Sequence, residues 1–236
     1  MEHVAEIRCK VHSIEPLTDV VSRVLLAPSQ AMTFKAGQYL RVIMGPEDKR
    51  PFSIASAPAN DSPYLELHIG AGPDNAYASE VLVKMREQGE VNVDGGHGKA
   101  FVRDNLPRPT ILVAGGTGFS YTYSILQELL KRNYHEPVFL YWGTRTLDDM
   151  YHYEQLMALS EQHTDFTFVP VIEQAPDDWH SKTGWVHKAV MEDFVSLEPY
   201  YVYIAGRFEM AGVAREDFHQ KGLIAEHLFG DAYEFI

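Results

Sequence analysis

Short segments of alternating polar and apolar residues dominate the first part of the chain. Residues 6–14 alternate in this way, as expected of a half-buried strand. Similar short segments, each followed by turn residues, cover residues 20–26, 39–44, 64–69 and 91–93. One helical pattern, at residues 76–87, interrupts them. Many short strands with a single helix predict a small antiparallel β-barrel.

The pattern changes after Leu106-Pro107-Arg108-Pro109. Residues 110–114 form a continuous apolar run, which is typical of a strand buried on both faces. Strand and helix patterns then alternate: strands at 138–142, 166–172 and 201–205, and helices at 121–132, 150–161, 186–194 and 210–220. Such alternation predicts βαβ units and a parallel sheet. We therefore expect two domains: residues 1–106, an antiparallel β-barrel, and residues 107–236, an α/β domain with a parallel sheet.

Composition and charge narrow the classes of function. Of the 236 residues, 45% are hydrophobic and 22% charged, as in ordinary globular proteins, and the net charge is −13. A strongly acidic chain argues against a broad surface for nucleic acid or anionic membranes. The N-terminal residues alternate in polarity rather than forming the apolar core of a signal peptide, and no window reaches the ~20 apolar residues of a membrane span. We expect a cytoplasmic protein.

The metal-ligating residue types argue against a metal centre. Cys9 is the one cysteine of the sequence, so a disulfide framework, a four-cysteine zinc site and an ordinary iron–sulfur cluster are excluded. The eleven histidines are scattered without ligand spacing. We expect no metal site.

A glycine-rich segment marks a candidate nucleotide site. Gly115-Gly116-Thr117-Gly118 lies where a buried strand ends and a helix begins, so a phosphate could approach the backbone and the free N–H groups of the helix N-terminus. In parallel sheets, ligands bind at this end of the strands. Because Tyr121 stands where a third glycine would, the run is not G-x-G-x-x-G. A tight turn without a ligand is the alternative.

The ends of two further strands carry candidate residues. Arg145 follows the strand at 138–142 and could accept the 2′-phosphate of NADPH, while Asp148 and Asp149 come a turn later. This arrangement tolerates NADPH without excluding NADH; a solvated loop charge is the alternative. At the last strand, Ala205 and Gly206 leave room for a flat ring, although an ordinary turn fits as well.

Arg50-Pro51-Phe52-Ser53 is a candidate flavin site. An isoalloxazine ring needs an apolar slot and a hydrogen-bond partner near N5. A Phe-Ser pair supplies an apolar face and a hydroxyl, which can both donate and accept. By composition alone, however, this segment fits any barrel strand.

The combination of motifs resembles the ferredoxin–NADP⁺ reductase superfamily, and within it the bacterial NAD(P)H:flavin oxidoreductases, relatives of which serve luciferase in luminous bacteria. The resemblance extends along nearly the whole chain. The segments that carry it are 34–40, 48–53, 66–70, 115–121, 141–143, 203–210 and the closing 231–236.

The resemblance implies roles for individual residues. Arg50, Pro51, Phe52 and Ser53 would contact the isoalloxazine, with Ser53 near N5 as the catalytic residue. Tyr39 would pack near the ring. The NAD(P)H side would comprise Gly115, Gly116, Thr117, Gly118, Phe119, Ser120, Tyr121, Arg145, Gly206, Arg207, Phe208 and Met210.

The resemblance also implies how the flavin is used. Residues 70–77 contain no Arg or Lys and carry Asp74, which fits a flavin that is held mainly by its ring and exchanged as a substrate. We expect NADPH or NADH to reduce riboflavin, FMN or FAD, and the product could pass to a flavin-dependent monooxygenase or a luciferase. One alternative is a reductase with tightly bound FAD that serves an iron–sulfur or other protein partner. Another is a non-catalytic nucleotide-binding subunit or redox sensor.

Overall fold

The computed structural model describes residues 5–58, 62–73, 75–104, 108–132 and 134–236. It divides into two compact units, which we describe separately: residues 1–102 with 123–131, the first unit, and residues 103–122 with 132–236, the second unit. The expected boundary between residues 106 and 107 falls outside the described residues and stays a prediction. That residues 123–131 belong with the first unit was not expected.

The first unit is an antiparallel barrel. Its strands are β1 (Ile7–Pro16), β2 (Val21–Pro28), β3 (Tyr39–Ile43), β4 (Lys49–Ser53), β5 (Leu65–Gly70) and β6 (Glu90–His97). Within the described residues they form a six-stranded sheet in the order β4-β3-β6-β1-β2-β5. The two edges meet just after β4, where the N–H of Ala55 donates to the carbonyl of Glu66 at 2.8 Å. The antiparallel barrel is confirmed.

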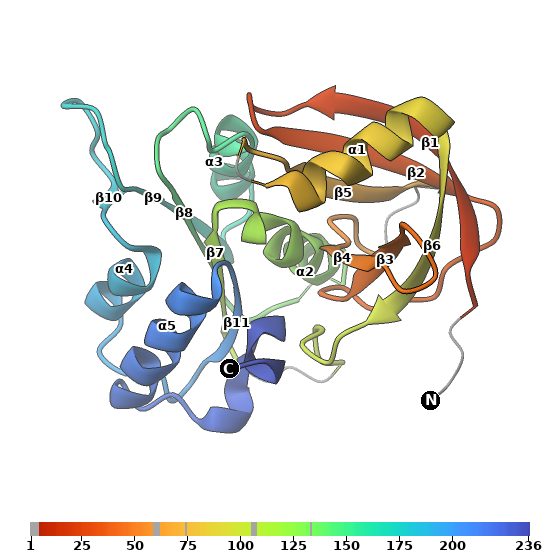
Figure 1. Cartoon of the computed structure of the whole chain (residues 1–236). Helices are drawn as coiled ribbons and strands as arrows, with labels where there is room; N and C mark the ends of the chain where they lie inside the picture. Colours follow the sequence, from red (N-terminus) through yellow and green to blue (C-terminus); the bar gives the residue numbers. More distant parts are fainter. Residues whose placement is uncertain (1–4, 59–61, 74, 105–107, 133) are drawn as a thin grey trace. The chain divides into compact units, whose positions relative to one another are not determined.

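Helix α1 (Ala76–Gln88) packs on this barrel (Figure 1). The side chain of Asn75 caps its first turn by accepting from the N–H of Ala78. Gly89, with φ of +67°, ends the helix in the left-handed conformation that glycine adopts at little cost. The buried helix residues Ala78, Val81, Leu82 and Met85 join the apolar core of the barrel.

The second unit contains a parallel sheet, as expected. Its strands are β7 (Thr110–Gly115), β8 (Val138–Thr144), β9 (Phe166–Ile172), β10 (Lys182–Thr183), β11 (Tyr201–Ala205) and β12 (Leu228–Phe229). Every pairing between these described strands is parallel, in the order β10-β9-β8-β7-β11-β12. Because β11 lies beside β7, the chain reverses its direction of winding there, which creates the kind of switch point where ligands bind.

Helices lie on both faces of this sheet. They are α3 (Tyr153–Gln162), α4 (Val186–Asp193) and α5 (Phe208–Gln220), with short 3₁₀ turns at Gly116–Gly118, Ala225–His227 and Asp231–Glu234. Helix α2 (Phe119–Lys131) begins in this unit, and its residues from 123 on belong to the first unit. Side chains of α4 and α5 share one apolar core with Ile111, Val113 and Val171 of the sheet. On the opposite face, Tyr153 of α3 packs edge-on against Phe168 of β9.

The later turns of α2 belong to the first unit and are tied to it by hydrogen bonds. Ser124 Oγ donates to the carbonyl of Ser56 at 2.9 Å, and Gln127 Nε2 donates to that of Ala55 at 2.8 Å. Both carbonyls lie in the segment that follows β4. The helix therefore contacts the segment adjoining the candidate flavin strand.

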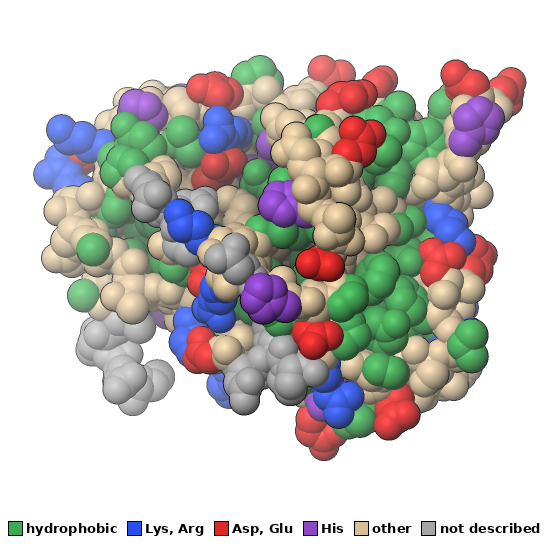
Figure 2. Space-filling model, turned by 180° about the vertical axis from the view of Figure 1, so that it is seen from behind, with side chains coloured by type: hydrophobic (Ala, Val, Ile, Leu, Met, Phe, Trp, Pro, Cys, Tyr) green, Lys and Arg blue, Asp and Glu red, His purple; other side chains and the backbone are tan. Residues whose placement is uncertain are grey.

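Two general features bear on function. No helix among the described residues has the length and apolar character needed to cross a membrane. On the face shown in Figure 2, Lys and Arg side chains are scattered among acidic, polar and hydrophobic ones rather than gathered into one broad patch.

Candidate active site

Strands β3 and β4 carry the candidate flavin residues. Tyr39 of β3 lies directly opposite Ser53 of β4, and Leu40 lies opposite Phe52. Because directly paired residues share a face of the sheet and neighbours along a strand alternate, Tyr39 and Ser53 lie on one face. Leu40 and Phe52 lie on the other, where both pack in the barrel core.

The alternation separates the side chains of the Phe-Ser pair. The side chains of Phe52 and Ser53 point to opposite faces and do not line one slot. The exposed Pro51, two residues before Ser53 on the same strand, shares the face of the hydroxyl. Contact of a flavin with Phe52 and Pro51 stays a prediction.

Gln38 fixes the beginning of β3 in place. Its Nε2 donates to the carbonyls of Gly96 and Gly98 at 2.8 and 3.0 Å, and its Oε1 accepts from the N–H of Lys35. Its own backbone carbonyl accepts from the N–H of Ile54, the residue after Ser53, at 3.1 Å. One side chain and its backbone thus tie together the ends of β3, β4 and β6, next to Tyr39 and Ser53.

A charged cluster on the same face was not predicted from the sequence. Asp94 of β6 is 1% exposed and accepts from Arg41 at 2.8 and 2.9 Å and from Lys49 at 3.0 Å. His97 Nε2 lies 2.8 Å from the same carboxylate, and its ring lies beside that of Tyr39 at 5.5 Å between centroids.

Electrostatics keep Asp94 ionised. Burial alone would raise the pKa of Asp94, but hydrogen bonds from Arg41, His97 and Lys49 outweigh it and hold the pKa well below its usual value. In the sequence, the polar residues Tyr39 and Arg41 alternate with apolar ones, which indicates that one face of β3 is exposed. The partners of Arg41 could not be predicted, because they depend on how the strands pair.

Arg50 points away from Ser53. It pairs across the strands with Val42, on the core face of the barrel, and is 8% exposed. Its guanidinium contacts Asp48 and Glu80 and lies over the ring of Tyr77, 4.5 Å from the centroid. The expected contact of Arg50 with the isoalloxazine stays a prediction.

In the second unit, the glycine run lies at the carboxyl end of β7, as predicted. Gly116 has φ of +54°, which favours glycine, and its carbonyl accepts from Trp142 Nε1 at 2.9 Å. Thr117 is exposed at the tip of the turn. A Cβ on Gly118 would come within 2.3 Å of the carbonyl oxygen of Ala205, so the close approach to β11 requires glycine.

The next three residues are buried beneath this turn. The ring of Phe119 stacks on that of Trp142 with 3.9 Å between centroids. Burial raises the pKa of the Tyr121 hydroxyl. Ser120 Oγ is buried and has no hydrogen-bond partner among the described residues. That Phe119, Ser120 and Tyr121 line a nucleotide pocket stays a prediction.

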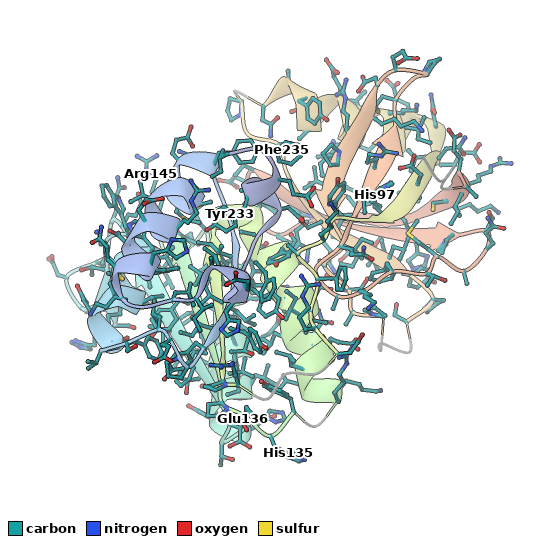
Figure 3. The ribbon with its side chains drawn as sticks, turned by 90° about the horizontal axis from the view of Figure 1, so that it is seen from below. His97, His135, Glu136, Arg145, Tyr233 and Phe235 are labelled. Carbon is teal, nitrogen blue, oxygen red and sulfur yellow. The ribbon has the colours of Figure 1, made fainter. Side chains whose placement is uncertain are left out.

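At the end of β11, Met210 lies over two glycines. A Cβ on Gly115 would meet its Sδ at 2.7 Å, and one on Gly206 would meet its Cε at 2.5 Å. Arg207 and Phe208 are exposed, and the ring of Phe208 lies 6.1 Å from that of Phe235 in the C-terminal segment (Figure 3). The small residues thus form a cradle at the carboxyl ends of two neighbouring strands.

Arg145 lies in the loop after β8, on the surface of the second unit (Figure 3). The nearby Asp149 is engaged elsewhere, because its Oδ2 accepts from the N–H and the hydroxyl of Thr146 at 3.0 and 2.8 Å. No ion pair or hydrogen bond engages the Arg145 guanidinium in the part of the chain that the structure describes. A cation there can attract an additional phosphate.

The structure groups the candidate residues by unit. Tyr39 and residues 50–53 lie on adjacent strands of the first unit. Residues 115–121, Arg145 and residues 206–210 follow the carboxyl ends of β7, β8 and β11 in the second. Among the described residues, no group of three or more His, Cys, Asp or Glu side chains could hold a metal ion.

Comparisons with known proteins show what this chain is similar to. The family model of the oxidoreductase NAD-binding domain matches residues 112–216. An NAD(P)H-flavin reductase of Vibrio harveyi is 51% identical over 235 residues, covering 98% of this chain and 99% of the relative. A second NAD(P)H-flavin reductase, from Aliivibrio fischeri, is 49% identical with the same coverage.

The fold is also found in solved structures. The ferredoxin reductase in carbazole 1,9a-dioxygenase superposes with a TM-score of 0.82 over 97% of this chain and 69% of its own, at 22% sequence identity. That likeness shows a common two-domain, ferredoxin reductase-like fold. The identity of about one half to two flavin reductases, over nearly the full length of each chain, establishes that this chain belongs to the family of NAD(P)H-flavin reductases.

Proposed function

We propose that this chain transfers hydride from NAD(P)H to a flavin that binds and leaves as a substrate. The reaction is NAD(P)H + H⁺ + oxidised flavin → NAD(P)⁺ + reduced flavin. The observation that carries the proposal is the 51% identity, over nearly the whole of both chains, to a protein named NAD(P)H-flavin reductase. The parallel sheet with its glycine turn supports the nucleotide half of the reaction.

On the flavin side, the proposed acting group is the Ser53 hydroxyl. A hydroxyl can donate a hydrogen bond to N5 of the oxidised flavin and accept one from the N5–H of the reduced flavin, so it can remain a partner of N5 throughout. Tyr39 shares its face and lies directly opposite, and Gln38 holds the ends of both strands. These supports would keep the hydroxyl in position during hydride transfer.

On the nucleotide side, the turn at Gly116–Gly118 would receive the pyrophosphate of NAD(P)H. The N-terminus of a helix offers free N–H groups and a positive dipole end, and exposed Thr117 adds a hydroxyl. The cradle of Gly115, Gly206 and Met210 would flank the nicotinamide. The unpartnered Ser120 hydroxyl supports a polar ligand nearby, because a buried hydroxyl without a partner costs about 1–3 kcal/mol.

The protein has little covalent chemistry to perform. The cofactors carry the hydride chemistry, so the chain must bring nicotinamide C4 against flavin N5 in a reactive orientation. We expect the turnover to depend on positioning by residues such as Ser53 more than on acid–base groups.

The purified protein distinguishes this proposal from a reductase with resident FAD. We expect a colourless protein after gel filtration that oxidises NADPH or NADH only when riboflavin, FMN or FAD is added. A yellow protein that retains stoichiometric FAD would favour the resident-cofactor reductase. No NAD(P)H oxidation with any of the three flavins would contradict both and leave a non-catalytic role.

The fate of the product and the location belong to the same proposal. Free reduced flavin could pass to a flavin-dependent monooxygenase or a luciferase. We place the reaction in the cytoplasm, where NAD(P)H is available. An assay that couples the enzyme to such a monooxygenase tests the transfer, with diffusion across a dialysis membrane as the control for direct contact.

A further inference from the structure

Trp142 holds a carbonyl of the glycine turn from the neighbouring strand. It lies near the carboxyl end of β8, paired with Ala114 of β7, and is completely buried. Its Nε1 donates to the carbonyl oxygen of Gly116 at 2.9 Å. The backbone N–H of Phe119 donates to the same oxygen. Two donors from different segments thus engage this one carbonyl, and the proposed function assigns no role to the indole.

Aromatic neighbours fix the orientation of the indole. The ring of Phe119 stacks on it with 3.9 Å between centroids and 11° between planes. The ring of Tyr151 meets it edge-on at 5.0 Å. The indole N–H is a donor only, and its direction is set by the plane of the ring. Because packing holds the ring, the N–H points at one place, the Gly116 carbonyl.

The same peptide unit carries the N–H of Thr117. In a planar trans peptide the C=O and the N–H point in opposite directions. A Gly116 carbonyl directed at Trp142 therefore turns the Thr117 N–H away from the aromatic cluster. Gly116 and Thr117 are both exposed, at the tip of the turn. An N–H directed outward at the start of a helix is the group that an anion needs there.

Glycine makes this peptide easy to rotate. Gly116 has φ of +54°, and nothing lies within 4 Å of the position that a Cβ would take. Glycine passes readily between backbone conformations, so rotation of the peptide between Gly116 and Thr117 meets little steric resistance. A rotated peptide would present its carbonyl oxygen, rather than its N–H, to an approaching phosphate. The hydrogen bond from Trp142 opposes this rotation.

We propose that Trp142 is a positioning residue for NAD(P)H: its indole N–H holds the Gly116 carbonyl inward and keeps the Thr117 N–H directed at the pyrophosphate. The inference rests on the proposed function, in which the turn at Gly116–Gly118 receives that pyrophosphate. Trp142 acts through the turn and touches neither nucleotide nor flavin. Because NADPH and NADH share the pyrophosphate, the effect is the same for both.

Removing the indole N–H tests the proposal. Trp142→Phe keeps an aromatic ring against Phe119 but has no donor. The matched control is Trp179→Phe, because Trp179 Nε1 donates to the carbonyl of Lys182 at 2.9 Å, an equivalent bond between β9 and β10. For Trp142→Phe we expect the KM values for NADPH and NADH to rise about 5–10-fold, as for one lost hydrogen bond, while kcat and the KM for riboflavin change less than about twofold. Trp179→Phe should match the wild type.

A second measurement retains Trp142 and does not depend on the folding of Trp142→Phe. The sequence contains three tryptophans, so the double variant Trp179→Phe/Trp185→Phe leaves Trp142 as the one source of an indole N–H signal. NMR of the isotope-labelled chain follows this signal as NADP⁺, which donates no hydride, is added. We expect the signal to shift until the nucleotide saturates the protein, and its exchange with solvent to slow. Riboflavin alone should leave it unchanged.

Other outcomes contradict the inference. It is overturned if Trp142→Phe leaves both nucleotide KM values unchanged, lowers kcat alone, or behaves as Trp179→Phe does. It is likewise overturned if the indole signal does not respond to NADP⁺, and this result decides alone if Trp142→Phe fails to fold. In those cases the wild type would still reduce flavin with NAD(P)H, so the proposed function would stand. A wild type that oxidises neither NADPH nor NADH with any flavin would overturn both.

Discussion

Gly118 lies so close to Ala205 that a single added carbon would overlap it: a Cβ built on Gly118 falls 2.3 Å from the carbonyl oxygen of Ala205. The contact joins the turn after β7 to the end of β11. These strands are neighbours in the sheet, and their carboxyl ends carry the proposed nucleotide residues. The glycine run is therefore required for packing as well as for access of a phosphate to the backbone.

Gly118→Ala should destabilise the protein by about 1–3 kcal/mol, because the clash is with backbone that cannot rotate away. It should also raise the KM for NAD(P)H by displacing the turn. The matched control is Gly45→Ala, where a Cβ would meet nothing within 4 Å and stability should change by about 0.5 kcal/mol or less. Urea unfolding measures both. Equal stability of the two variants would contradict the packing that we describe.

Arg145 should set the preference between the two nucleotides. In Arg145→Ala we expect the KM for NADPH to rise about tenfold while that for NADH stays within twofold, because only NADPH carries the 2′-phosphate. Arg86→Ala, an exposed position on α1, controls for loss of one surface charge. Steady-state kinetics with both nucleotides give the answer. A parallel change for NADPH and NADH would assign the phosphate contact elsewhere.

Glu66 should make stability depend on pH. Burial would raise its pKa, but hydrogen bonds with His68 and Arg23 outweigh burial and lower the pKa from 4.5 to about 2. A carboxylate with a lowered pKa in the folded state stabilises that state fully above pH 4.5, and this contribution is lost as the pH falls toward 2. It amounts to about 3 kcal/mol at most.

The comparison of wild type with Glu66→Gln isolates this contribution. Unfolding free energies measured from pH 7 to the lowest pH at which the fold persists should converge as the pH falls below 4.5. Parallel curves throughout that range would show that the folded-state pKa of Glu66 is not lowered.

Local patterns were sufficient to predict the main elements. Alternation in residues 6–14 indicated an antiparallel sheet with one exposed face, because successive side chains of a strand point to opposite faces. The continuous apolar run at 110–114 indicated a parallel sheet, because its strands are buried on both faces. The turn after the first parallel strand could also be predicted from the sequence, because its backbone conformation and packing require glycine. Its positive φ at Gly116 and its tight packing at Gly118 each exclude larger residues.

Pairings between distant segments were not predictable. That Tyr39 lies opposite Ser53 depends on strand register, and that Arg50 contacts Glu80 depends on where α1 packs. The Asp94 cluster likewise joins three strands. The two faces of β4 also follow from the register: Phe52 lies toward the barrel core, and Ser53 lies on the face of Tyr39.

The central claim, that Ser53 supports hydride transfer to an exchangeable flavin, is tested most directly by rapid mixing. Wild type, Ser53→Ala and the exposed-loop control Ser29→Ala would be mixed with riboflavin and NADPH, and flavin reduction followed at 450 nm by its loss of absorbance. We predict that Ser53→Ala slows hydride transfer about 10²-fold or more while the riboflavin dissociation constant changes less than threefold. Ser29→Ala should match the wild type. Hydride transfer at the wild-type rate in Ser53→Ala would contradict the account.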